Sequence, residues 1–223
     1  MDLQITNYTD THEFISDNGV RSVVYLMDCM EGLKQIPDKY FELAIVDPPY
    51  GIGINHNIGR RSGDKKSNYK KVNWDFNIPT TNYFEKLYLK TINQIIWGAN
   101  YFSMNPTKCF IVWRKPQISE AVSFSMLEYA WTSFNKTSKE WIGISDEKDR
   151  LHPTQKPIAL YEWLIKNYAK EGDKILDTHL GSGSSRIAAH KAKLPFMGFE
   201  LDADYFYASV KRFNEYTSQQ TIF

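Results

Sequence analysis

Residues 44–51 constrain this chain most, because an apolar run ends there in the tetrapeptide Asp-Pro-Pro-Tyr. The apolar residues before it are typical of a buried strand. Pro48 and Pro49 cannot donate to a sheet ladder, and a proline disfavours helical backbone in the residue before it. We therefore expect a stiff, extended turn that holds the carboxylate of Asp47 and the ring of Tyr50 at the carboxyl end of a strand, where ligands bind in open α/β sheets.

Such a turn suits a planar ligand that carries an amine. Asp47 and the carbonyl of Pro48 can accept hydrogen bonds from an exocyclic NH₂ group, while Tyr50 stacks on the ring. The alternative is a tight turn with an ordinary surface tyrosine, because prolines commonly interrupt regular structure in loops.

Apolar runs and amphipathic segments alternate along the rest of the chain. This alternation predicts an α/β fold, in which a Rossmann-like, doubly wound mixed sheet is covered by helices on both faces. A length of 223 residues predicts one domain over residues 1–223. We expect strands at 23–27, 41–46, 95–97, 109–113, 130–134, 140–144, 173–177 and 195–200, and helices at 29–36, 83–93, 119–124, 157–168, 184–191 and 203–214.

The composition narrows the class of protein. A formal net charge of +1 excludes a uniformly basic protein, so any contact with nucleic acid must come from a local patch. Cys29 and Cys109 are too few for a disulfide framework and lack the spacing of zinc ligands. No apolar run approaches the roughly 18 residues of a membrane span, and the polar start of the chain has no signal-peptide core. We expect a cytoplasmic protein that has no metal site and contacts no membrane.

A polar stretch at about 51–79 lacks apolar periodicity. Loops of this length inside compact domains are usually functional or disordered. Its basic residues predict contacts with phosphates, and the alternative is a solvated charged surface. The candidates are Arg60, Arg61, Lys65, Lys66, Lys70 and Lys71.

A second candidate site follows the strand expected at 173–177. Asp177 ends that strand, and a Gly-Ser-Gly-Ser turn at 181–184 leads into a helix. Small residues there let a nucleotide-like ligand approach the free NH groups of a helix start. Glu200 ends the next strand, where an acid would reach ribose hydroxyls. The alternatives are a tight strand-to-helix turn and an acid at a helix entry beside Asp202.

The tetrapeptide Asp47-Pro48-Pro49-Tyr50 resembles the catalytic motif of the amino-methyltransferases, which methylate the exocyclic amine of adenine or cytosine in DNA. The form that begins with Asp is mostly the adenine version. This motif precedes the glycine turn by over a hundred residues, which is similar to the β arrangement of the family, a circular permutation. The resemblance covers roughly residues 22–214 and implies a methyltransferase fold with these four residues as the catalytic set.

The resemblance also implies S-adenosylmethionine as the cofactor. The family writes its cofactor motif Asp-Pro-x-x-Gly-Ser-Gly, and this chain has Thr178 in place of the proline and His179 in place of a frequent phenylalanine. The segment His-Pro-Thr-Gln-Lys-Pro at 152–157 is similar to one that holds the methionine carboxylate. The implied cofactor residues are Asp28, Thr154, Lys156, Asp177, His179, Gly181, Ser182, Gly183, Ser184 and Glu200, although Asp28 serves equally well as a helix cap.

In the mechanism that the resemblance implies, Asp47 accepts a hydrogen bond from the target amine and so frees its lone pair for attack on the sulfonium methyl group. In double-stranded DNA the base must first flip out, and Tyr50 would then stack on it. A short segment at about 115–150 occupies the place where family members often carry DNA-recognition material. The oligomeric state is open, a homodimer included.

Several alternatives stay open at the level of sequence. The acceptor could be the N4 amine of cytosine, RNA or a free nucleotide, and a non-catalytic nucleic-acid-binding module could keep the cofactor fold. A nicotinamide dehydrogenase is disfavoured, because Arg186 stands where the third glycine of its fingerprint belongs.

Overall fold

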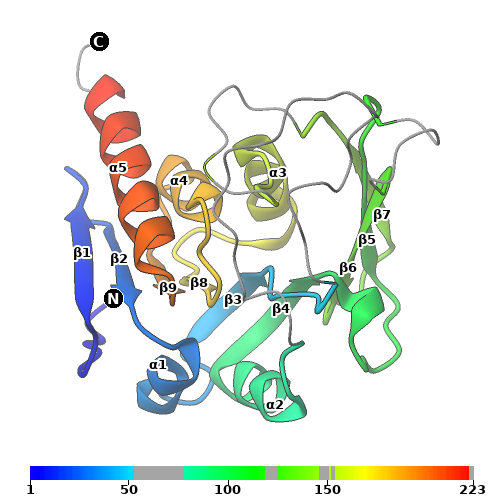
Figure 1. Cartoon of the computed structure of the whole chain (residues 1–223), viewed down its shortest axis with the longest axis horizontal. Helices are drawn as coiled ribbons and strands as arrows, with labels where there is room; N and C mark the ends of the chain where they lie inside the picture. Colours follow the sequence, from blue (N-terminus) through cyan, green and yellow to red (C-terminus); the bar gives the residue numbers. More distant parts are fainter. Residues whose placement is uncertain (53–77, 119–124, 146–150, 152–153, 221–223) are drawn as a thin grey trace.

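The computed structural model describes residues 1–52, 78–118, 125–145, 151 and 154–220. Within these ranges a single nine-stranded mixed sheet runs through the molecule, in the order β1-β2-β9-β8-β3-β4-β6-β5-β7 (Figure 1). The strands are β1 (Asp10–Ile15), β2 (Arg21–Leu26), β3 (Phe41–Val46), β4 (Thr91–Trp97), β5 (Phe110–Arg114), β6 (Leu127–Thr132), β7 (Lys139–Ile142), β8 (Ile175–Asp177) and β9 (Phe196–Glu200). The expected doubly wound mixed sheet is confirmed.

The centre of the sheet is parallel. β2, β9, β8, β3 and β4 pair in parallel, while β1 joins β2 and β6 joins β4 in antiparallel fashion. β3 lies directly beside β8, with Leu43 opposite Ile175 and Ala44 opposite Leu176. The two stretches that carry candidate chemistry therefore leave the same edge of the sheet from neighbouring strands.

Helices cover both faces of this central part (Figure 1). One face carries α1 (Cys29–Gln35) and α2 (Thr81–Lys90), and the other carries α3 (Ile158–Tyr168), α4 (Ser184–Lys191) and α5 (Ala203–Gln220). Side chains of the strands alternate between two apolar clusters: Leu43 and Ile45 of β3 pack with the α3 side, and Ala44 and Val46 pack with the α1 side. Burial on both faces explains why β3 is a continuous apolar run.

The end of one helix and the presence of one strand differ from the sequence expectation. The helix expected through residue 93 is wrong beyond Lys90, because Thr91 begins β4 and pairs with Phe41 of β3. The hydroxyl of Thr91 donates to the carbonyl of Leu87 at 2.6 Å, so helix and strand join without a loop. β1 was not expected at all, since this edge strand shows only partial burial.

The remaining differences from the sequence expectation are shorter shifts of element ends, or they concern segments outside the described residues. α5 continues past residue 214 to Gln220, and the helix expected at 119–124 lies outside the described residues. Part of the segment at 115–150 forms β6 and β7 of the main sheet. Its role in DNA recognition stays a prediction, as does the single domain. Among the described helices, none is long and apolar enough to cross a membrane. The described residues also contain no cluster of three metal-ligating side chains.

Candidate active site

The Asp-Pro-Pro-Tyr turn begins where β3 ends, and it holds its acid between two donors. Asp47 Oδ1 accepts a hydrogen bond from the hydroxyl of Tyr50 at 2.5 Å, and Oδ2 accepts one from Nζ of Lys156, also at 2.5 Å. Lys156 belongs to the segment just before α3, which is 109 positions away in sequence. The expected carboxylate at the end of a strand is present, and a cation that the sequence could not connect to it lies in contact.

The ring of Tyr50 is held from two sides. It stacks on Tyr101, with ring centroids 5.1 Å apart and an interplanar angle of 14°, and it meets Phe102 edge-on. Gly98 supplies the room, because a Cβ atom there would lie 2.0 Å from the Tyr50 ring. Gly98 also has a φ of +68°, which favours glycine.

Two residues that the sequence analysis missed complete a chain of charges. Glu128 of β6 lies 3.0 Å from Lys156, and Lys115 forms an ion pair with the other oxygen of Glu128. Lys156 is 3% exposed and Lys115 is 9% exposed. Glu128 could have been suspected from β6 itself, since it alternates with apolar residues and shares a face with the buried Ala130.

The pKa values in this chain of charges depend on burial and on their neighbours. Burial raises the pKa of Asp47, against the opposing charge of Lys156, and the negative charge of Glu128 raises it further. Burial also opposes ionisation of Glu128, but Lys156 and Lys115 outweigh it and hold the Glu128 pKa below its usual range. Burial lowers and the two acids raise the pKa of Lys156, and the acids prevail. The opposite charges of this cluster therefore favour the ionised form of Glu128 and the ammonium form of Lys156.

The glycine turn lies at the end of the neighbouring strand, β8. Gly181 and Gly183 have φ angles of +51° and +74°, and Gly183 is the residue that caps α4. A Cβ atom at Gly183 would lie 3.3 Å from Cβ of Ser209 on α5, so the helix packs closely there. The left-handed backbone suits the expected approach of a ligand to this turn, which stays a prediction.

The two acidic side chains at this turn, Asp177 and Glu200, accept hydrogen bonds from nearby donors. The carboxylate of Asp177 accepts from the hydroxyl of Ser185 at 2.5 Å and from the NH of His179 at 3.0 Å, and burial raises its pKa to about 7. Glu200 Oε2 accepts from the NH of Gly181 at 2.8 Å, which ties the end of β9 to the turn. Its other oxygen accepts from the NH groups of Leu201 and Asp202. Glu200 thus performs the helix-entry role that the sequence left open, and a ribose contact stays a prediction.

His179 and Thr178 occupy the two positions where the chain departs from the usual motif. Thr178 shares a 2.6 Å hydrogen bond with the hydroxyl of Tyr83 on α2, and His179 lies edge-on to the same ring at 5.4 Å. Burial lowers the pKa of His179 to about 4, so the imidazole is neutral at pH 7. Thr178 and His179, which replace the usual motif residues, therefore both contact Tyr83 of α2. Next to them, Ser182 and Ser184 contact each other through their hydroxyls, and Arg212 donates to both residues.

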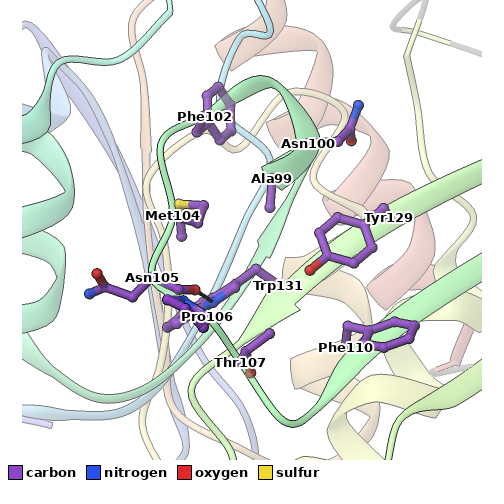
Figure 2. Close-up of a pocket in the computed structure, with 10 residues that line it drawn as sticks. All are labelled: Ala99, Asn100, Phe102, Met104, Asn105, Pro106, Thr107, Phe110, Tyr129 and Trp131. Carbon is purple, nitrogen blue, oxygen red and sulfur yellow. Dashed lines mark hydrogen bonds between the residues drawn. The ribbon is translucent and has the colours of Figure 1, made fainter.

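A groove of about 600 Å³ (Figure 2) is lined in part by Phe102, whose ring also meets that of Tyr50 edge-on. Trp131 forms part of its floor and donates from Nε1 to the carbonyl of Asn105 at 2.7 Å, and the Tyr129 hydroxyl is directed across it. The lining is aromatic and amide-rich: Ala99, Asn100, Phe102, Met104, Asn105, Pro106, Thr107, Phe110, Tyr129 and Trp131. Ala99 and Asn100 connect this groove to Tyr101, the ring on which Tyr50 stacks.

A family model of N6/N4 methyltransferases, described as DNA methylase, matches residues 80–211, which is more than half of the chain. The chain belongs to this family of DNA methylases. The match includes the glycine turn and Glu128 but begins after the Asp-Pro-Pro-Tyr turn. The geometry around Asp47 is therefore an observation independent of this match.

Named relatives agree with the family. The type II methyltransferase M2.LlaDCHI of Lactococcus lactis subsp. cremoris is 27% identical over 65% of this chain and 50% of its own length. M2.DpnII of Streptococcus pneumoniae is 28% identical over 63% of this chain and 49% of its own length, so the chain spans about half the length of these two relatives. M2.MboI of Moraxella bovis is 22% identical over 87% of this chain and 88% of its own length.

Solved structures show the same fold. The M1.HpyAVI-SAM complex matches with a TM-score of 0.58 and 22% identity, over 85% of this chain and 98% of that one. The PvuII DNA methyltransferase, a cytosine-N4-specific protein, matches with a TM-score of 0.59 and 15% identity, over 85% of each chain.

The remaining candidate residues of this DNA methylase are a helix cap, a residue ahead of α3 and a set outside the described residues. Asp28 caps α1 by accepting from the NH of Met30 at 2.8 Å, so the capping alternative is confirmed and its cofactor role stays a prediction. Thr154 lies partly exposed ahead of α3. The phosphate-contacting candidates between Arg60 and Lys71 lie outside the described residues.

Proposed function

We propose that this DNA methylase transfers a methyl group from S-adenosylmethionine to the exocyclic N6 amine of adenine in DNA. One observation carries the proposal: Asp47 follows β3 and Asp177 ends β8, its parallel neighbour, so an amine-orienting turn and a glycine turn share one edge of the sheet. This arrangement brings the two substrates of a group transfer side by side at the place where open α/β sheets bind ligands.

The residues of the glycine turn fit the cofactor. Gly181 and Gly183 leave no side chain on the approach to the start of α4, where the first NH groups of a helix have no partner within the helix itself. The cofactor supplies an electrophilic sulfonium methyl group. Asp177, His179, Ser182, Ser184 and Glu200 would surround it, with Asp28 and Thr154 at its ends.

On the acceptor side, the chain would position the amine. Asp47 and the carbonyl of Pro48 would accept its N–H groups, which localises the nitrogen lone pair for an in-line attack. The carbon–sulfur bond of the methyl donor would break as the carbon–nitrogen bond forms, so the donor would leave as a neutral thioether and the excess proton of the amine would pass to water. Tyr50, already packed against Tyr101, would stack on the target base, a contact that contributes about 1–3 kcal/mol.

The substrate would be double-stranded DNA with the target base flipped out. The loop residues Arg60 to Lys71 would contact phosphates, and the relatives named type II methyltransferases support a role in restriction–modification in the cytoplasm. The protein would act as a monomer or a homodimer.

The experiment measures methyl transfer directly. Purified protein is incubated with tritiated S-adenosylmethionine and double-stranded DNA, and the DNA is then digested to nucleosides for mass spectrometry. We expect N6-methyladenine. N4-methylcytosine would replace the adenine assignment, and labelled RNA or mononucleotides in parallel reactions test the other acceptors. Cofactor binding without transfer to any acceptor would support a non-catalytic module instead.

A further inference from the structure

Glu128 is the charged residue beside the catalytic turn whose role the motifs do not explain. Its side chain is 22% exposed, and Oε1 is held by Lys115. Oε2 is buried and lies 3.0 Å from Nζ of Lys156, but this ion pair lacks the geometry of a well-directed hydrogen bond. A buried carboxylate oxygen without a well-directed hydrogen bond is unfavourable, so Oε2 is an acceptor that a small movement of Lys156 would satisfy.

The hydrogen bonds of Asp47 make such a movement relevant to the reaction. Tyr50 donates to Oδ1 and Lys156 donates to Oδ2, each at 2.5 Å, so both oxygens already have a close partner from the protein. A target amine would share one of these oxygens with a donor from the protein, because each carboxylate oxygen can accept two hydrogen bonds. The bond from Lys156 is charge-assisted and is therefore the stronger competitor.

Lys156 is suited to change partners. Its ammonium is a compact charge with three donors on a flexible stem, and Asp47, Tyr50 and Glu128 all lie within 3.2 Å of it. The cluster contains two lysines, Lys115 and Lys156, and two acids, Asp47 and Glu128. A shift of Lys156 toward Glu128 leaves that balance intact, which avoids an unpaired buried charge.

We propose that Glu128 is a positioning residue that takes over Lys156 from Asp47 when the target amine binds. Lys115 anchors Glu128 in the orientation that this exchange needs. The proposal rests on the proposed methyl transfer, and it assigns to β6 a part in the reaction in addition to its place in the sheet.

The first test compares three variants. Glu128→Gln removes the charge that receives Lys156, and Glu128→Asp keeps the charge with a shorter reach. Glu140→Gln is the matched control, because Glu140 forms a 2.7 Å pair with Arg114 on neighbouring strands, where both side chains are about half exposed. We expect kcat to fall about 10- to 100-fold in E128Q, while KM for the cofactor stays within about threefold. E128D should recover part of kcat, and E140Q should match the wild type. A parallel fall in cofactor binding and kcat would overturn the proposal.

A double variant separates positioning from folding. E128Q alone leaves Lys115 without its ion-pair partner. Adding Lys115→Met removes that unpaired charge, so the double variant keeps one cation, Lys156, and one anion, Asp47. We expect the melting temperature to recover in the double variant while kcat stays low. Recovery of kcat together with stability would mean that Glu128 only balances charge, and the proposal would be wrong.

A measurement without turnover keeps the two proposals distinct. Carboxyl ¹³C NMR of the cofactor-free protein gives the pKa of Asp47, which should fall in E128Q because the repulsion from Glu128 is removed. The titratable groups that act on Asp47 in the described structure are Lys156, Glu128, Tyr50, Tyr161 and Asp177. An unchanged pKa would overturn the role of Glu128. Wild-type protein that methylates nothing would instead overturn the proposed function.

Discussion

The two halves of the candidate site satisfy their acids in opposite ways. At the glycine turn, Asp177 accepts from groups two and eight residues away, and Glu200 accepts from an NH nineteen residues away. At the catalytic turn, Asp47 depends on Lys156, which is 109 residues away, and Lys156 also contacts Glu128 of a different strand. The first half uses backbone NH groups and one serine hydroxyl from within about twenty residues, and the other uses charged side chains that are distant in sequence.

This difference predicts which substitutions disrupt each half of the site. A binding turn made of backbone is sensitive to added volume and to backbone strain. A network of buried charges is sensitive to the removal of any single partner, because the remaining charge stays buried. The four predictions below use this contrast, from the largest expected effect to the smallest.

The largest effect is expected for Asp47→Ala. Methyl transfer should fall by about 100- to 1,000-fold or more, because the target amine loses its acceptor, while cofactor affinity changes little. A tritium-transfer assay measures the first quantity and calorimetry measures the second. Activity near that of the wild type would refute the catalytic assignment of the turn.

Replacing Arg60, Arg61, Lys65 and Lys66 with alanine should weaken binding of DNA and leave binding of the cofactor at the glycine turn unchanged. The slope of log affinity for DNA against log salt should become shallower by roughly 0.9 for each phosphate that the variant no longer neutralises, and cofactor affinity should not change. A salt titration of DNA binding measures the slope. A slope identical to that of the wild type would show that these charges form only a solvated surface.

Gly181→Val tests the backbone half. Gly181 has a φ of +51°, and a β-branched side chain there is both strained and in the way of the ligand, so cofactor affinity should fall about 10- to 100-fold. Gly172→Val is the matched control, since Gly172 has a φ of +81° and open space around it. The control should lose stability without losing affinity. Equal affinities in wild type and G181V would remove the glycine turn from the binding site.

The smallest effect concerns His179 and pH. Burial holds its pKa at about 4 in the folded protein, below the ordinary value of 6.5. The unfolded chain therefore takes up a proton first, and this residue reduces stability as the pH falls from 6.5 to 4. His179→Phe should remove that pH-dependent decrease, so the stability of the variant relative to the wild type should rise steadily as the pH falls from 6.5 to 4, with little difference at pH 7. Thermal melts across this range test it, and a difference independent of pH would contradict the assignment.

The local half of the site was accessible from sequence because its partners are neighbours in the chain. The bounds of β3 and α4 were predicted as they occur, since an apolar run stopped by prolines and a helix that follows glycine are local signals. The end of α2 was not, because pairing of Thr91 with Phe41 overrides helix propensity. Lys156 was assigned to the cofactor from its motif, and its contact with Asp47 could not have been inferred from that motif.

By itself, the sequence determined the class of fold, the stiff acidic turn and the glycine turn, because proline and glycine restrict or widen backbone angles wherever they stand. Only the tertiary structure decided which charges meet. Parallel pairing of β3 with β8 brings the two turns to one edge, and the antiparallel approach of β6 to β4 brings Glu128 to Lys156. Such contacts depend on strand order and on burial across a hundred residues of chain, and no local pattern specifies either one.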